Sequence, residues 1–337
     1  MNIKSLLIGS AAALAAVSGA QAADAIVAAE PEPMEYVRVC DAFGTGFFYI
    51  PGTETCLKFG GYVRFQTNFG RNASGTSDWD SFTRAQFEVD TRTDTELGAL
   101  RGFIGFRGNA DSGVGSSTAS SSGNLGSGVF VDQAFIELGG LKVGKFYSEW
   151  DNDLNGETDL LSTNTLFNSI AYTYDAGSFK ATLSVDELEG VSEADNSVGI
   201  TGVLGATLGP VSATLVGSYD TDYEEGAIRA ILFADVGPGT FGLAGVWASG
   251  ENGYYTESEW AVAAEYAIKA TDKLTITPAA QYLSDYQLED GVDAWTAGLT
   301  VDYKITDGLA TKVTANYFDV DGQDDEVTGF VRLQRSF

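Results

Sequence analysis

The sequence predicts an all-β protein, a 16-stranded antiparallel transmembrane β-barrel. Sixteen segments alternate apolar and polar residues with a period of two, which is the period of a strand because successive side chains point to opposite faces. The connections between these segments alternate between short turns and long polar loops. The chain also begins with a stretch that has the composition of a secretory signal, which predicts export.

Residues 1–22 are predicted to be a cleavable signal peptide. They have a charged start at Lys4, an apolar run, and a small-residue exit that ends at Ala22. The apolar run is too short to span a bilayer as a helix. Cleavage after Ala22 would leave a mature chain that begins at Ala23.

Residues 23–55 are predicted to be a lead-in on the periplasmic side, flexible at first and then closed by a disulfide. Cys40 and Cys56 are the only cysteines of the chain. The compartment beyond the inner membrane is oxidising, so we expect them to be paired. Closing a loop of about 15 residues stabilises a fold by about 3 kcal/mol in the chain-entropy model.

Residues 56–337 are predicted to form the barrel. In the first strand, residues 56–70, Phe59 and Phe65 lie on one face and Arg64 lies on the other. The same alternation recurs to the end of the chain, less clearly in the third and eighth segments. The predicted strands are 56–70, 79–94, 96–108, 129–139, 141–147, 168–175, 178–186, 198–208, 211–219, 227–236, 240–248, 258–269, 273–284, 293–305, 309–318 and 327–337.

The connections distinguish a membrane barrel from a soluble sandwich. The short ones contain Gly, Pro and Asp, the residues of tight turns, and the long ones are polar and mostly acidic. An outer-membrane barrel has one end with short turns, one end with long loops, and an even number of strands. A soluble sandwich would instead need every apolar face packed between two sheets. We therefore expect a closed barrel whose apolar face meets lipid.

Composition excludes several classes of function. The chain has 47 acidic and 19 basic residues, a formal net charge of −28, whereas nucleic-acid binding needs a basic patch. It has no histidine, the usual general base and zinc ligand, so no enzyme, cofactor or metal site is predicted. Residues 151–156 (DNDLNG) match half of a calcium loop, but Ser162 stands where a bidentate Glu belongs. The acidic loops are either solvated or hold divalent cations shared with lipopolysaccharide.

Three stretches carry a resemblance to a known family. They are VRVCDAFGTGFFYIPGTETCLK (37–58), GGLKVGKFYS (139–148) and VRLQRSF (331–337). The chain resembles the general porins of alphaproteobacteria over its whole length. The resemblance implies a homotrimer of water-filled pores in the outer membrane, surrounded by lipid and lipopolysaccharide, that passes small hydrophilic solutes passively.

The resemblance also implies that the third long loop folds into the lumen and narrows it. Here that loop is residues 149–168. It has an apolar patch able to pack on the inner wall, formed by Leu154, Leu160, Leu161, Leu166 and Phe167. The acidic residues expected at the constriction are Glu149, Asp151, Asp153, Glu157 and Asp159. The alternative is an ordinary solvated outer loop.

Arginines on the first strands are expected to face this acidic loop. The predicted basic arc consists of Arg64, Arg84, Arg101 and Arg107. Opposed charges across a pore create a transverse field that orients dipolar solutes. The alternative is that these arginines merely pair with carboxylates of the wall such as Glu88 and Asp90, and both arrangements can hold at once.

The sequence therefore predicts a general diffusion porin that is weakly cation-selective and is not an enzyme. Two alternatives remain open. One is a substrate-selective channel for sugars or carboxylates. The other is a plugged barrel that serves as an adhesin or anchor, which the lack of a long non-barrel insertion argues against.

Overall fold

The chain divides into two units, Met1–Arg38 and Val39–Phe337, and the second contains the barrel. The predicted signal peptide, residues 1–22, lies outside the described residues, as does most of the lead-in before Cys40. The computed structural model describes residues 37–111, 128–191 and 195–337.

Sixteen long strands make up the barrel. They are β2 (Cys56–Phe69), β3 (Trp79–Thr93), β4 (Leu100–Asp111), β5 (Phe130–Leu138), β6 (Leu141–Tyr147), β7 (Leu166–Asp175), β8 (Phe179–Glu187), β9 (Val198–Leu208), β10 (Val211–Asp220), β11 (Glu225–Val236), β12 (Gly239–Ala248), β13 (Ser258–Lys269), β14 (Leu274–Tyr286), β15 (Ala294–Thr306), β16 (Leu309–Val320) and β17 (Glu326–Ser336). Shorter elements are β1 (Phe48–Tyr49) and the 3₁₀ turns η1 (Asp41–Phe43) and η2 (Glu149–Asp151).

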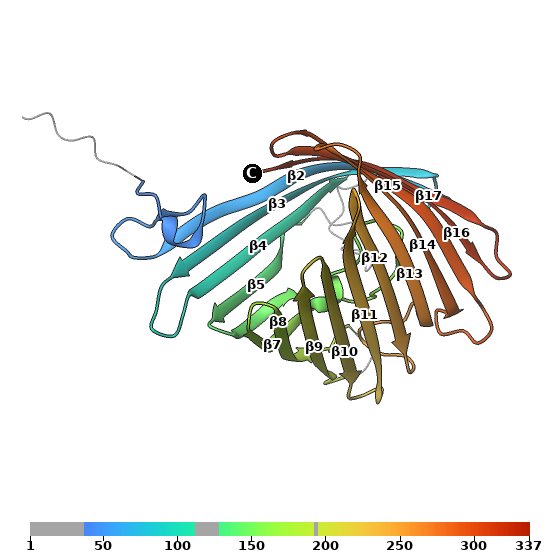
Figure 1. Cartoon of the computed structure of the whole chain (residues 1–337), viewed down its shortest axis with the longest axis horizontal. Coiled ribbons are helices and arrows are strands. Elements are labelled where there is room, and N and C mark those ends of the chain that lie inside the picture. The colour runs from blue at the N-terminus through green and yellow to red at the C-terminus, as the bar shows by residue number, and fades with distance from the viewer. Residues whose placement is uncertain (1–36, 112–127, 192–194) are drawn as a thin grey trace, which may run out of the picture. The chain divides into compact units, whose positions relative to one another are not determined.

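Each long strand pairs antiparallel with the next one along the chain, and the strands follow one another around the barrel in Figure 1. The last strand closes the sheet on the first, with Arg332 beside Gln66 and Leu333 beside Phe65. Closure removes both sheet edges and satisfies the backbone internally. The predicted 16-stranded antiparallel barrel is confirmed, and β1 is a short addition that pairs with β2.

The strand boundaries differ from the prediction mainly at β4, which begins at Leu100 instead of residue 96. Thr95 and Gly98 form a turn there: the Thr95 hydroxyl donates to the Gly98 carbonyl at 2.5 Å, and the Gly98 N–H donates to the Thr95 carbonyl at 3.0 Å. A Thr side chain that bonds its own turn competes with the ladder, so the strand starts later.

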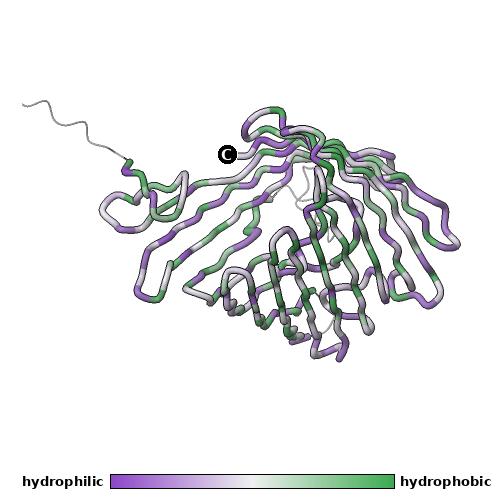
Figure 2. Tube along the Cα trace, in the orientation of Figure 1, coloured by the Kyte–Doolittle hydropathy of each residue, from purple (hydrophilic) through white to green (hydrophobic). Residues whose placement is uncertain are grey.

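The two faces of the barrel wall differ in polarity. Hydrophobic and hydrophilic residues alternate along the strands in Figure 2. On β2, the side chains of Phe59, Val63 and Phe65 are 46–51% exposed, whereas Arg64 and Gln66 lie on the opposite face. In the described part of the chain, no helix has the length and hydropathy needed to cross a membrane.

A disulfide pins the segment before the barrel to the first strand. Cys40 and Cys56 are bonded, which confirms the predicted pair. Both are buried in a small apolar cluster with Phe47, which is 5% exposed. Cys56 lies opposite Arg92 of β3, so the segment packs on the polar face of the wall at the end with short turns.

Candidate functional site

The loop between β6 and β7, residues 148–165, contacts seven strands that come later in the chain, β10, β11 and β13 to β17. It is shorter than predicted, because residues 166–168 already belong to β7. It begins with η2, where the Ser148 hydroxyl accepts the N–H of Trp150. The Trp150 indole then donates to Ser218 of β10 at 2.8 Å. Loop 148–165 therefore packs against a strand that is distant in the sequence.

Arg229 of β11 holds the two ends of loop 148–165 together. Its side chain is 1% exposed. The guanidinium donates to four loop carbonyl groups, at 2.6–3.1 Å: those of Glu149, Trp150, Asn152 and Leu161. It also pairs with the carboxylate of Asp153 at 2.8 Å. Five contacts from one fixed fork specify the loop conformation more tightly than an ammonium could.

Polar side chains of β13 and β14 hold the middle of loop 148–165. Glu265, 3% exposed, accepts the N–H and side-chain amide of Asn155 and the N–H of Gly156 at 2.7–2.8 Å. Gln281 accepts from the backbone N–H of Leu160 at 2.6 Å and donates to its carbonyl at 2.7 Å. These contacts replace the water that a solvated loop would bind, so the backbone groups stay satisfied.

Loop 148–165 is also held by apolar packing. Leu154, Leu161 and Phe167 are buried in the largest described cluster together with Trp150. Leu160 packs against a second apolar cluster, so four of the five residues of the predicted apolar patch are packed against other apolar side chains. Gly298 of β15 allows the close approach, because a Cβ there would lie 2.7 Å from the Thr158 hydroxyl.

A second loop, residues 249–257, locks the first one in place. The Tyr254 carbonyl accepts the N–H groups of Thr163 and Asn164, at 3.0 and 3.2 Å. The Tyr254 hydroxyl donates to the carboxylate of Asp186 at 2.8 Å. Asp186 is 1% exposed and also accepts from three other hydroxyl groups, those of Ser169, Ser184 and Thr201.

Two cations of the last two strands, Lys312 of β16 and Arg332 of β17, lie beside Glu157 of loop 148–165. Glu157 lies 2.7 Å from the Lys312 ammonium and 3.6 Å from the Arg332 guanidinium. Lys312 also lies 3.5 Å from Asp302. Glu157 therefore has cationic partners, but none of the four arginines of the predicted arc is among them.

Arg64 and Arg84 lie side by side on the polar face without a carboxylate. They are directly opposite in the β2–β3 register. The Arg64 Nε donates to Gln334 at 2.8 Å and the Arg84 Nε to Asn109 at 2.9 Å. Neither lies within 4 Å of an acidic oxygen of the described residues. Like charges directly opposite on a sheet are unfavourable, so this pair costs stability.

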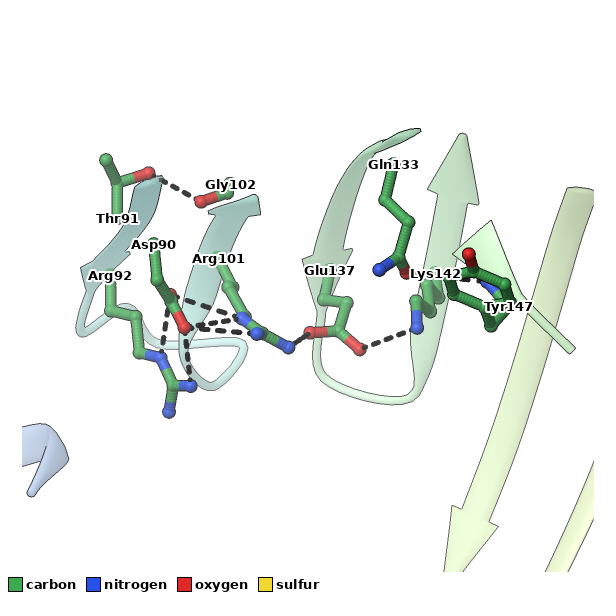
Figure 3. Close-up of polar contacts among 9 residues, drawn as sticks. All are labelled: Asp90, Thr91, Arg92, Arg101, Gly102, Gln133, Glu137, Lys142 and Tyr147. Carbon is green, nitrogen blue, oxygen red and sulfur yellow. Dashed lines mark hydrogen bonds and ion pairs between the residues drawn. The ribbon is translucent and has the colours of Figure 1, made fainter. Parts of the chain in front are cut away.

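Arg101 and Arg107 are engaged by the wall itself. Arg101 bridges Asp90 and Glu137 at 3.0 and 2.7 Å, in a chain of ion pairs that also contains Arg92 (Figure 3). Arg107 pairs with Asp132 at 2.9 Å and donates to the Tyr147 hydroxyl at 3.0 Å. For these two members of the predicted arc, the alternative of pairing with wall carboxylates holds.

The sequence comparisons identify the family. A porin subfamily model matches residues 24–334. The chain belongs to this porin subfamily. It is 55% identical over 351 residues to a putative outer membrane protein, y4fJ, of Sinorhizobium fredii (strain NBRC 101917 / NGR234), covering 100% of this chain and 99% of that protein. It is 48% identical to outer membrane protein IIIA of Rhizobium leguminosarum bv. viciae, covering 98% of this chain and 93% of that protein.

The fold agrees with solved outer-membrane structures. OmpT of Vibrio cholerae in its trimer form aligns with a TM-score of 0.64 at 14% identity, over 85% of this porin and 100% of that chain. At this identity the likeness is one of fold. The porin is thus an outer-membrane protein with the architecture of a porin channel.

Two predicted acidic residues of the porin, Asp151 and Asp159, have raised pKa values. Burial and the nearby charge of Asp153 raise the pKa of Asp159 to about 7. One of its carboxylate oxygens is buried without a hydrogen bond among the described residues. Burial also raises the pKa of Asp151, whose carboxylate accepts from the Thr165 hydroxyl at 3.0 Å.

The half calcium loop of the porin is used for contacts with the wall. Asp153 pairs with Arg229, and Asn155 donates to Glu265. Within residues 37–111, 128–191 and 195–337, no three acidic or cysteine side chains converge as metal ligands would.

Sequence reasoning missed the three basic residues that contact loop 148–165: Arg229, Lys312 and Arg332. The predicted arc lies on the first strands, where basic residues are dense. An isolated Arg within an apolar run, as Arg229 is between Ile228 and Ala230, is the available signal, since a buried charge needs a partner.

Proposed function

We propose that this porin is a general diffusion channel that passes small hydrophilic solutes and ions, with loop 148–165 inside the lumen as its constriction. The contacts of that loop carry the proposal. Its partners belong to seven strands, β10, β11 and β13 to β17, and all of them lie on the polar face: Ser218, Arg229, Glu265, Gln281, Thr300, Lys312 and Arg332. A segment inside a closed barrel can reach this face of so many strands, which supports the proposed position of the loop.

The charges at this level support a transverse field. Arg64, Arg84 and Arg332 lie on neighbouring strands, and Glu157 is the nearest acidic group of loop 148–165. Opposed charges in a narrow aqueous passage orient dipolar solutes and disfavour apolar ones. The excess of acidic residues over the whole chain favours a weak preference for cations.

One observation favours a second candidate, a channel selective for carboxylates. Arg64 and Arg84 have no carboxylate partner among the described residues, and arginine clusters select anions in pores. A carboxylate solute could take the place that a protein carboxylate leaves open. Transport would be passive in either case, and the surroundings would be outer-membrane lipid and lipopolysaccharide.

Planar-bilayer recordings in a KCl gradient test the proposal. We expect ohmic single-channel currents and a reversal potential with the sign of a weak cation preference. Arg84→Glu should increase the cation preference, whereas Lys180→Glu at an exposed turn should not. A reversal potential of the opposite sign in the native porin would favour the carboxylate channel. Absence of any channel current would support a plugged barrel instead.

A further inference from the structure

A polar cavity lies at the short-turn end of the barrel wall, away from loop 148–165. Its volume is about 300 Å³. The disulfide-closed segment forms one wall through Phe43 and Phe47, and strands β2 to β4 form the other through Lys58, Glu88 and Arg101. A cavity of this size holds one small solute molecule.

Most charges around this cavity are already neutralised. Asp90 pairs with Arg92 at 2.9 Å and with Arg101 at 3.0 Å, as the dashed lines in Figure 3 show. Arg101 in turn pairs with Glu137 at 2.7 Å. Because these charged groups are paired with one another, they have few hydrogen-bonding positions left for a ligand.

Lys58 and Glu88 are the two lining charges without an ion pair to any described residue. The Lys58 ammonium lies 5.8 Å from the centre of the Phe47 ring. The Glu88 carboxylate accepts one hydrogen bond, from the Gln86 amide at 2.6 Å. The cavity thus presents one free ammonium and one carboxylate with free lone pairs.

The disulfide-closed segment positions this pair of charges. Phe47 is held against the bonded Cys40 and Cys56, with the Arg92 guanidinium 5.1 Å from its ring centre. Gly46, at a positive φ, lies against the Lys58 stem, because a Cβ there would be in van der Waals contact with it, 3.4 Å from the Lys58 Cε. The ammonium is therefore directed by packing rather than free in solvent.

We propose that this cavity is a second solute site, which binds small zwitterions such as free α-amino acids. The solute carboxylate would pair with Lys58 and its ammonium with Glu88. A simple anion or a simple cation satisfies only one of these two charges, so each should bind more weakly than a zwitterion. The site is distinct from the constriction and adds selectivity at the short-turn mouth.

Isothermal titration calorimetry on the purified porin in detergent tests the site. The probes are leucine, its N-acetyl derivative and its amide, which carry both charges, only the carboxylate and only the ammonium. We expect leucine to bind about tenfold more tightly than either derivative. Equal affinity for all three, or no heat of binding for leucine at millimolar concentrations, would overturn the proposal.

Matched variants assign the two charges. Lys58→Met and Glu88→Gln should each weaken leucine binding about tenfold, the effect of losing one charge-assisted hydrogen bond. Lys180→Met and Asp175→Asn remove an exposed ion pair at another turn and should leave binding unchanged. Weakening by the controls to the same extent would show that overall charge, not this cavity, decides binding.

Reduction of the disulfide provides an independent test, because it frees the wall that holds Phe43 and Phe47. We expect the reduced porin to lose leucine binding while the barrel stays folded, as shown by different gel mobilities of unheated and boiled samples. Unchanged binding after complete reduction would overturn the role of this wall. Calorimetry needs no open channel, so these outcomes do not depend on the proposed diffusion function.

Discussion

Arg229 is the side chain on which the position of loop 148–165 most depends. It is fully buried, and its two terminal NH2 groups donate to carbonyl groups that lie at both ends of the loop. A buried Arg that satisfies backbone oxygens fixes a conformation as well as a charge. If loop 148–165 narrows the lumen, Arg229 sets how far it does so.

We therefore predict that Arg229→Met widens the pore. The variant leaves the carbonyl groups of buried Trp150 and Leu161 without their donor, and each unsatisfied buried acceptor costs about 1–3 kcal/mol, enough to release the loop ends from β11. Single-channel conductance and the size of the largest polyethylene glycol that enters should both increase. Arg71→Met, which removes an exposed pair with Asp324, serves as the control. A folded Arg229→Met barrel with native conductance would contradict the prediction.

Asp159 should make stability depend on pH. Its folded pKa of about 7 lies above the ordinary 3.8, so the folded state binds more protons between these values. Its contribution is therefore most favourable at low pH and falls as pH rises toward 7. Asp159→Asn should raise the thermal unfolding midpoint at pH 8 and leave it unchanged near pH 3. A similar gain for Asp321→Asn, in another loop, would show a general charge effect instead.

At the scale of elements, two segments outside the strand pairing are held in place, one by a disulfide and one by hydrogen bonds. Loop 249–257 holds loop 148–165 in place through Tyr254. Burial and the nearby charge of Asp186, to which the Tyr254 hydroxyl donates, raise the pKa of this tyrosine. The disulfide does the same for the segment that precedes β2. Where the backbone leaves the barrel wall, these contacts hold it in place instead of strand pairing.

The disulfide should stabilise the fold measurably. The double variant Cys40→Ser/Cys56→Ser removes a closed loop of about 15 residues, worth about 3 kcal/mol in the chain-entropy model. We expect a lower urea midpoint for unfolding of the folded porin in detergent. Native protein treated with reductant should shift equally. No shift in either sample would mean that the segment is held by packing of Phe47 alone.

At the scale of the whole molecule, the outer face of the barrel is apolar and continuous around the wall. Rings on neighbouring strands stack on this face, as Phe59 and Phe87 do with centres 5.5 Å apart. Trp79 on the same strand pair is 63% exposed. In the outer membrane such a face is covered by lipid or by another copy of the chain.

We predict a homotrimer, as the family resemblance implies. Native mass spectrometry in mild detergent should give three times the mass of the mature chain, which we expect to begin at Ala23. The same measurement tests cleavage of the signal peptide. A boiled sample should give the mass of one chain. A single-chain mass under mild conditions would contradict the prediction.

The strands of this porin were predictable from the sequence because a period of two is a local signal. The alternation of neighbouring residues is enough to place Phe59 and Phe65 on one face of the strand and Arg64 on the other. The same local pattern, repeated over sixteen strands with alternating connection lengths, determined the barrel. The proximity of the cysteines and the compartment of the protein likewise determined the disulfide.

The partners of loop 148–165 were decided only by the tertiary structure. Asn155 bonds a residue 110 positions away, and Glu157 bonds Lys312, 155 positions away. Nothing in a local pattern specifies which distant strand a loop meets, because barrel closure brings those strands together. For the same reason the sequence did not show that Arg101, a member of the predicted arc, contacts Asp90 of β3 and Glu137 of β5.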